Sequence, residues 1–463
     1  MGVLGALAKI GEYFPSPPRP ARKPDLKRRL FYTFLALIVY YVMASTLAFP
    51  LAAHPELRGV PVPPIINIVF ASSAGSIAQL GIGPMVTAGL IIQILVGAKI
   101  IELDLTDPRD RKLFTQAEKG LAFIIACVEG AGFAAYYRLN TFITAAILLQ
   151  FLFGAIVLMI LDEAIQKGWG IGSGVSLFIL AGVARTIVWD LFAPVKTSNI
   201  DQYYGFIPYL IRAFTQGQVD MSRLFFGVVS GINRVLPSLT GLITVIVLVT
   251  VLVYLQQMKV NIPVTMQRLP GIKSKVPLQF IYVTNIPILL VGIVFSDLML
   301  LNNLSAAYLT ERAPWLAGAL RTAIYYLTPP RTVLELVYSP VRVAVYSVLL
   351  VGLAIVFGFM WVEIAGLGPS AQAENLIKSG LQMPGIRRNP KLLEKVLSRY
   401  IYPLTVLSSL IVALIALTAD IFSAYGTGTG ILLAVGIVQQ FYTQIAYERA
   451  LEAYPLLKRL IGE

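Results

Sequence analysis

The run LPSLTGLITVIVLVTVLVYLQQ at residues 236–257 decides the fold class of this protein. It contains no charged side chain, and it is long enough to cross a hydrocarbon core of about 30 Å as one helix. Similar runs recur along the 463 residues, of which 57% are hydrophobic and 13% charged, and the mean hydropathy is +0.76. The sequence therefore predicts an integral membrane protein and excludes a soluble enzyme.

Ten apolar runs meet the length criterion, separated by Gly, Pro and charged residues. The predicted spans are 30–49, 76–100, 116–137, 141–161, 171–192, 236–257, 277–301, 341–362, 400–418 and 428–447. An even number of spans puts both termini on the same side of the membrane. We therefore expect an all-α polytopic membrane protein with ten transmembrane helices.

Basic residues outside the spans indicate the orientation. The chain has 37 Lys and Arg against 24 Asp and Glu, for a net charge of +13. Clusters of Lys and Arg fall in the N-terminal tail and in 258–276 and 387–399, which all lie on one face in this topology. Because cytoplasmic loops carry an excess of Lys and Arg, we expect both termini in the cytoplasm of a protein in the cell membrane.

The run 61–70 does not fit a simple span. It is apolar but only about ten residues long, too short to cross a bilayer, and Pro63, Pro64 and Asn67 interrupt it. Irregular backbone at membrane depth is tolerated only inside protein or beside a water-filled cavity. The run is therefore either a re-entrant piece beside an internal cavity or a loop on the lipid surface.

The fifth and tenth spans share a second feature, a Gly-rich entry with Ser or Thr. These entries lie at 170–174 and 426–430. Two related halves of five helices around a central site would produce this repetition, and close helix packing would also favour glycine there.

Catalytic chemistry has little support in the sequence. The single cysteine, Cys127, and the single histidine, His54, cannot supply a disulfide, a His/Cys zinc site or a Cys-His pair. Glu129 and Arg185 are the clearest charged residues within spans, with either structural or functional roles. Charged residues near span ends, which we expect to be solvated, are Asp162, Glu163 and Asp297. We expect no enzymatic activity and no cofactor. The remaining candidate function is a pathway across the membrane, sealed by branched aliphatic side chains that exclude water by dewetting.

Several strings resemble the SecY-type protein translocation channel, and most of all its archaeal branch. The most specific is LGIGPMVTAGLIIQ at 80–93. The others, in the same order and spacing as in the family, are DRKLF at 110–114, LDE at 161–163, GIGSG at 170–174, YVTNIP at 282–287, RYIYPLT at 399–405 and GTG at 428–430. The resemblance covers nearly the whole chain.

The resemblance implies two pseudo-symmetric halves, 1–203 and 204–463, around an hourglass pore with a lateral opening to lipid. It implies a passive channel that translocates secretory proteins and inserts membrane proteins sideways. Residues 64–73 would form a plug. The residues that would fill the pore as this plug are Ile65, Ile66, Asn67, Ile68, Val69 and Phe70. Many relatives carry an Arg at the end of the plug, where this chain has Ser73, so we expect apolar contacts to hold the plug.

The resemblance also implies site residues and partners. The aliphatic pore ring would consist of Ile82, Val86, Val175, Ile179, Leu289 and Leu433. Thr87 and Asn285 would be polar residues of the lateral gate, between the second and third helices and the seventh and eighth. Ribosome-binding residues in the loops 258–276 and 363–399 would be Arg268, Lys273, Lys275, Arg387 and Arg388. The implied partners are small subunits of the SecE/gamma type and the beta type, the ribosome with its RNA, signal sequences, nascent chains and membrane lipids.

Two other functional classes remain as alternatives. A secondary transporter could also have ten helices, related halves and a broken segment, but the spans lack the expected ion-coupling residues. An intramembrane enzyme would need a Ser/His, paired Asp or metal site within the spans, and His54 lies outside them.

Overall fold

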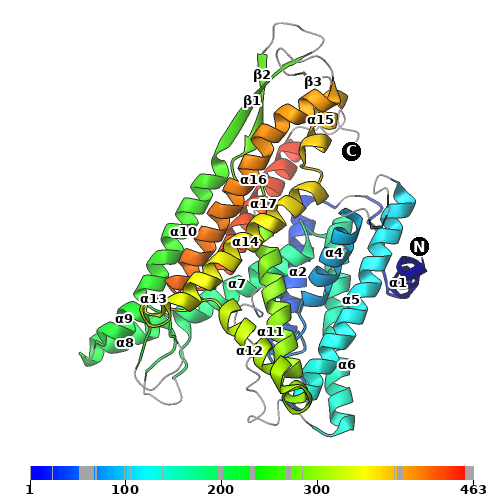
Figure 1. Ribbon diagram of the computed structural model, residues 1–463. Coiled ribbons are helices and arrows are strands. Elements are labelled where there is room, and N and C mark those ends of the chain that lie inside the picture. Colours follow the sequence, from blue (N-terminus) through cyan, green and yellow to red (C-terminus); the bar gives the residue numbers. More distant parts are fainter. Residues whose placement is uncertain are drawn as a thin grey trace.

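The computed structural model of the protein is a bundle of long helices with a small β-sheet beyond one end (Figure 1). It describes residues 2–22, 24–51, 67, 70–97, 100–101, 103, 107–137, 139–196, 202–217, 219–229, 235–266, 273–283, 285–379, 381–382 and 389–453.

Helices occupy all ten predicted spans in the part of the chain that the structure describes. They are α2 (Leu26–Ser45), α4 (Gly83–Gly97), α5 (Pro108–Tyr136), α6 (Thr141–Ala164), α7 (Gly174–Phe192), α10 (Leu239–Gln257), α11 (Ile286–Arg312), α14 (Pro340–Ile364), α16 (Pro390–Ile421) and α17 (Gly428–Ala453). Among the described residues, seven helices are long and apolar enough to cross a membrane, and Gly83–Gly97 and Ile286–Met299 are shorter apolar helices. The predicted polytopic helical fold is confirmed.

Shorter elements lie between and beside these helices. They are α1 (Gly2–Glu12), the π-helix η2 (Ile165–Trp169), α8 (Phe206–Gln216), α9 (Met221–Phe226), α12 (Pro314–Leu327), α13 (Glu335–Tyr338), α15 (Pro369–Lys378), β1 (Lys259–Met266), β2 (Lys273–Gln279) and β3 (Leu381–Gln382). The strands form one antiparallel sheet in the order β2-β1-β3.

Two predicted spans begin too early. The second was expected from residue 76, but Ser76 forms an isolated bridge with Leu47, and the backbone turns up to Gly81, whose φ is +55°, before α4 begins. The seventh was expected from Pro277, which instead lies in β2. Because β2 is an edge strand, a residue without an N–H group is tolerated there. Both stretches are apolar enough to be mistaken for helix.

Side-chain caps fix the beginnings of several helices. The Ser238 hydroxyl accepts the N–H of Gly241 at the start of α10, and the Asp107 carboxylate accepts the N–H of Arg109 at the start of α5. Asn389 does the same for Lys391 at the start of α16. Each cap satisfies an N–H that would otherwise lack a partner.

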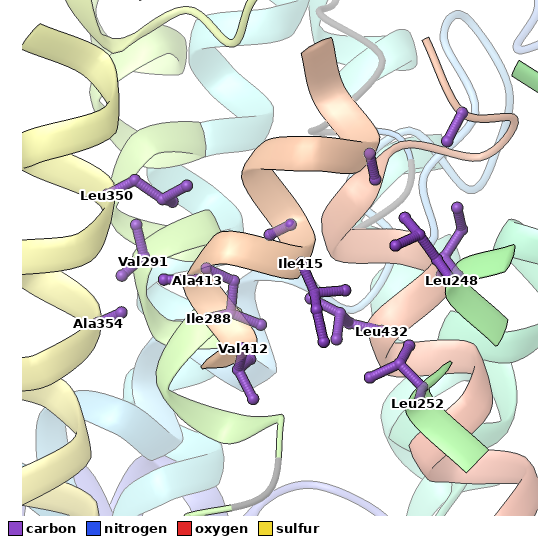
Figure 2. Packing of buried hydrophobic residues seen from close by; sticks show 14 of the residues in the cluster. Leu248, Leu252, Ile288, Val291, Leu350, Ala354, Val412, Ala413, Ile415 and Leu432 are labelled. Carbon is purple, nitrogen blue, oxygen red and sulfur yellow. The ribbon is translucent and has the colours of Figure 1, made fainter. Parts of the chain in front are cut away.

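The C-terminal half has its own apolar core (Figure 2). Leu350 and Ala354 of α14 face Val291 of α11, and Leu248 and Leu252 of α10 lie near Leu432 of α17. Between them lie residues of α16, namely Val412, Ala413 and Ile415. A separate cluster around Phe151 of α6 and Phe133 of α5 packs the N-terminal half. Each half is therefore internally well packed.

The sheet is fixed to the bundle through its first strand. Ile262 of β1 is buried and packs in one cluster with Val362 at the end of α14 and Leu397 of α16. Thr265 of β1 pairs with Gln382 of β3. The two predicted basic loops, 258–276 and 363–399, thus meet in one sheet.

Candidate pore and its seal

Two cavities enter the bundle from opposite ends. The outer cavity, of about 600 Å³, is lined by residues that include Tyr40, Arg185, Tyr204, Pro237 and Asp420. The inner cavity, of about 430 Å³, has a different lining that includes Phe14, Gly89, Glu118, Asp162 and Trp361. Phe14 belongs to the N-terminal segment, so the inner cavity opens on the side that the charge pattern assigns to the cytoplasm.

A single apolar cluster, which we call the seal cluster, lies between the two cavities. It contains all six predicted ring residues: Ile82, Val86, Val175, Ile179, Leu289 and Leu433. Ile82 precedes α4, and the other residues come from α4, α7, α11 and α17. Val86, Val175 and Leu289 also line the inner cavity, while Tyr40 of the same cluster lines the outer one. Elements far apart in sequence thus bring these aliphatic side chains together.

The described end of the predicted plug packs against this cluster. Phe70 is 2% exposed and packs with Leu290, Ile293 and Met299 of α11. The carbonyl oxygen of Phe70 accepts the N–H of the ring residue Ile82 at 2.7 Å. Asn67 lines the outer cavity. The other predicted plug residues, Ile65, Ile66, Ile68 and Val69, lie outside the described residues.

Polar contacts also hold this end of the plug, so the expectation of apolar contacts alone is wrong. The Tyr40 hydroxyl donates to the carbonyl oxygen of Ala71 at 3.1 Å. Arg185 of α7 donates through Nη1 to the Ser73 hydroxyl at 3.3 Å and to the Ala44 carbonyl oxygen at 3.4 Å. A guanidinium from the wall of the outer cavity thus contacts the end of the predicted plug.

A close backbone approach explains the glycine before the second span. A Cβ atom at Gly81 would lie 2.0 Å from the carbonyl oxygen of Phe70, and the φ of Gly81 is +55°. Only glycine combines this left-handed backbone with such an approach.

The two Gly-rich entries are anchored by buried aspartates. Asp162 of α6 accepts the N–H of Val175 at 2.9 Å, at the start of α7. Asp420 of α16 accepts the N–H of Gly428 at 2.9 Å, at the start of α17, and the Tyr346 hydroxyl at 3.0 Å. Asp162 is 9% exposed, so its predicted solvation is wrong. The carboxylate is buried because the N–H groups at the helix start satisfy it.

The two anchors repeat one pattern on opposite sides. A left-handed glycine, Gly172 or Gly426, stands two residues before the glycine that begins the helix. Asp162 lines the inner cavity and Asp420 the outer one. Sequence reasoning missed Asp420, because its role depends on the N–H of a residue eight positions further along the chain.

The structure separates the two predicted gate residues. The Thr87 hydroxyl of α4 lies 3.5 Å from the Asp297 carboxylate of α11, across the predicted seam. Asn285, just before α11, donates instead to the carbonyl oxygen of Leu432 in α17. At the inner end of the seam, a Cβ atom at Gly97 of α4 would lie 2.4 Å from Ile364 of α14. The seam is therefore closely packed.

The predicted ribosome-binding residues are only partly described. Lys275 is exposed on β2, and Lys273 begins that strand. Arg268, Arg387 and Arg388 lie outside the described residues. Within the described chain, no group of three or more His, Cys, Asp or Glu residues could hold a metal ion.

Comparison with known proteins agrees with this architecture. The family profile described as SecY matches residues 76–442. The protein translocase subunit SecY of Aeropyrum pernix is 50% identical over 100% of this chain and 99% of its own length. The corresponding subunit of Saccharolobus solfataricus is 44% identical over the full length of both chains.

Solved structures agree as well. A structure described as that of a protein conducting channel has 30% sequence identity and a TM-score of 0.78, covering 96% of this chain and 97% of that one. Another, of a SecY protein whose plug domain stabilises the closed channel, has 31% identity and a TM-score of 0.76 over the same shares. Sec61 in the canine ribosome-channel complex has 29% identity and a TM-score of 0.76, again over the same shares.

Proposed function

The chain belongs to the SecY family, and from that premise we propose that it is the pore-forming subunit of a protein translocase in the cell membrane. It conducts secretory chains across the membrane and releases hydrophobic segments sideways into lipid. One observation carries the proposal: aliphatic side chains from α4, α7, α11 and α17 meet in one cluster between two cavities that open at opposite ends.

The seal cluster acts as the ring of the pore. A constriction of branched aliphatic side chains excludes water and ions by dewetting, without fixed charge. Such side chains fit around a passing polypeptide of varying size because they change rotamer at little cost. The two cavities on either side then let a hydrated chain approach and leave the constriction.

The plug closes the outer side of this ring at rest. Its described end is joined to the ring by the bond from Ile82 to Phe70 and to the walls by Tyr40 and Arg185. A chain that enters the ring displaces Ile82 and so weakens the hold on Phe70. The plug then moves away while the passing chain keeps the constriction filled.

The lateral gate lies between α4 and α5 on one side and α11 and α14 on the other. The contact between Thr87 and Asp297 crosses this seam. Hydrogen bonds between membrane helices contribute only about 0.6 to 2 kcal/mol. A hydrophobic signal sequence can therefore replace such contacts when it inserts between the helices.

The basic sheet is the docking point for the ribosome. Lys273 and Lys275 lie on β2, and Arg268, Arg387 and Arg388 belong to the segments next to the strands. Contacts of Lys and Arg with RNA phosphates release counterions and are sensitive to salt. A structural relative was solved as a ribosome-channel complex, and small subunits of the SecE/gamma and beta types complete the channel.

The chain supplies a route rather than energy. It is a channel without a catalytic role or cofactor, so translation by the ribosome or another external partner drives the movement. A secondary transporter is the competing function, and it predicts that polar substitutions in the seal cluster leave the ion permeability unchanged.

Site-specific photocrosslinking from Ile179 tests the proposal. A photoreactive residue at Ile179 is combined with a ribosome-bound secretory chain stalled during translocation, and a chain without its signal sequence is the control. We expect crosslinks to the stalled chain that depend on the signal. Labelling only of lipid or of neighbouring helices, with the ribosome docked, would contradict the pore assignment.

A further inference from the structure

The hairpin formed by α8 and α9, which we call the outer hairpin, carries two apolar stripes on its first helix. The side chains of Phe206, Tyr209 and Ala213 are buried against the protein. A second stripe runs along Ile207, Leu210, Ile211 and Phe214, at the spacing of one helix face. Ile207 and Leu210 are partly buried, whereas Ile211 is 61% exposed and Phe214 74% exposed, so the protein leaves the second half of this stripe uncovered.

The second helix of the hairpin adds further uncovered apolar side chains. Met221 is 62% exposed, and Phe225 and Phe226 are 44% and 41% exposed. Val219, between the two helices, is also exposed. Large exposed apolar side chains that gather in one short segment indicate contact with another apolar phase.

Buried contacts hold the hairpin against the protein, so its exposed side chains do not belong to a detached loop. Arg223 of α9 is fully buried, donates to the carbonyl oxygens of Tyr204 and Pro237, and lies 4.7 Å from the centre of the Tyr209 ring. The Tyr209 hydroxyl donates to the carbonyl oxygen of Asp220, which links the two helices. Burial lowers the pKa of Arg223 to about 10, so it keeps its charge at neutral pH.

The hairpin continues the lipid-facing surface of the bundle. It extends sideways from the bundle beside the outer end of α10, opposite the sheet (Figure 1). Val188 and Phe192 in the last turns of α7 are 56% and 55% exposed, and Ile243 in the first turns of α10 is 52% exposed. The hairpin packs against both helices, since α8 contacts α7 and α9 contacts α10.

Basic and aromatic side chains lie beside the apolar stripe. Lys196 Nζ and Arg212 Cζ lie 6.0 and 5.7 Å from the centre of the Tyr203 ring. Tyr, Lys and Arg are typical of the headgroup region, where the aromatic ring sits between phases and the cations meet lipid phosphates.

We propose that the outer hairpin lies in the outer leaflet as an amphipathic interfacial anchor. Its exposed apolar side chains insert among the acyl chains, and Lys196 and Arg212 sit at the level of the phosphates. Tyr204 and Pro237, the two acceptors of Arg223, line the outer cavity. The anchor therefore holds one wall of the outer cavity at a fixed depth in the membrane.

Spin labels at single cysteines test this proposal. The only native cysteine is removed by Cys127→Ser, and labels are placed by Phe214→Cys and Phe225→Cys. Matched controls are Thr215→Cys and Ser222→Cys, exposed polar positions on the same two helices. The complete channel complex is reconstituted in vesicles of phosphatidylcholine and phosphatidylglycerol, and the collision rates of each label with oxygen and with a water-soluble nickel chelate are measured.

We expect an oxygen-to-nickel ratio severalfold higher at positions 214 and 225 than at the two controls. A ratio at 214 and 225 equal to that of the controls would show that the hairpin faces water and would overturn the proposal. Low collision rates with both reagents would show that a protein subunit covers the hairpin, and would overturn it as well. If Phe214→Cys does not assemble, Ile211→Cys carries the same expectation.

A second comparison tests the role of the two cations. With phosphatidylcholine alone, we expect the label at 214 to lie less deep than with phosphatidylglycerol present. Lys196→Gln combined with Arg212→Gln should abolish this difference. A depth that depends on the anionic lipid equally in both proteins would contradict the assignment of these cations to the phosphates.

Discussion

At the scale of single residues, the hold on the plug depends on Gly81. Gly81→Ala places a methyl group against the carbonyl oxygen of Phe70 and forces the plug end away from Ile82. We expect a resting channel with higher ion conductance in planar bilayers. Gly217→Ala is the matched control, because Gly217 has a similar φ of +64° with nothing within 4 Å. The control should lose about 1–2 kcal/mol for the left-handed backbone and conduct no ions at rest.

The anchor of α17 predicts a second residue-scale effect. Asp420→Ala leaves two buried donors, the N–H of Gly428 and the hydroxyl of Tyr346, without their acceptor. Each buried donor left without an acceptor costs about 1–3 kcal/mol, so we expect a loss of about 2–6 kcal/mol in the free energy of unfolding. Tyr346→Phe removes one of the two donors. The double variant should therefore lose less free energy of unfolding than the sum of the losses in the two single variants. Chemical unfolding in detergent measures the stability of the two single variants and of the double variant. Strictly additive losses would contradict the contact between Tyr346 and Asp420.

The grouping of side chains was predictable where a motif carried it. The six ring residues follow from family resemblance, and the structure brings them into one cluster. The burial of Asp162 could not be predicted from its position in the sequence, because it depends on a backbone N–H that lies 13 residues further along the chain. The contact of Arg185 with Ser73 joins α7 to the plug over 112 residues, which no local pattern reveals.

At the scale of elements, the basic sheet predicts a salt-dependent effect on ribosome binding. Lys275→Ala should weaken binding and lower the slope of log affinity against log salt by about 0.7 to 0.9, the value for one lost phosphate contact. Lys9→Ala on α1 removes the same charge from an exposed side chain outside the two basic loops. Sedimentation with ribosomes over a range of salt concentrations measures both variants. Equal slopes for the two variants would argue against a specific contact at Lys275.

Helix spans were predictable as elements because their length and hydropathy are local properties. The boundaries failed where an apolar segment is not helical, as at residues 76–82 and in β2. The sheet itself was not predicted, since its first and third strands lie more than a hundred residues apart and meet only through tertiary packing. The outer hairpin was also missed, because α8 is too short to stand out among the longer apolar runs.

At the scale of the whole molecule, the seam predicts how easily the two halves separate. Thr87→Val keeps the shape of the side chain and removes its hydroxyl from Asp297. The closed state should lose about 0.6 to 2 kcal/mol, a shift of about threefold to thirtyfold toward opening. We expect increased translocation of a secretory protein with a weakened signal sequence.

Thr244→Val is the matched control for the seam. The Thr244 hydroxyl donates to the Thr240 carbonyl oxygen within α10, so its loss changes no contact between helices. Translocation of the weakened substrate should remain at its original level in this variant. If the Thr87→Val channel translocates the weakened substrate no better than the control, the contact between Thr87 and Asp297 has no role in opening the gate.

The seal cluster has one more consequence for the molecule as a whole. Each half has a core of its own, whereas the seal cluster joins α2 and α7 to α11 and α17. Watertightness and cohesion between the halves therefore come from the same side chains. A translocating polypeptide separates these side chains, but it also contacts the side chains of both halves. Its contacts therefore replace the contacts between the halves that are lost. The two halves thus stay together while the channel is open and occupied. These contacts are lost only when the substrate leaves.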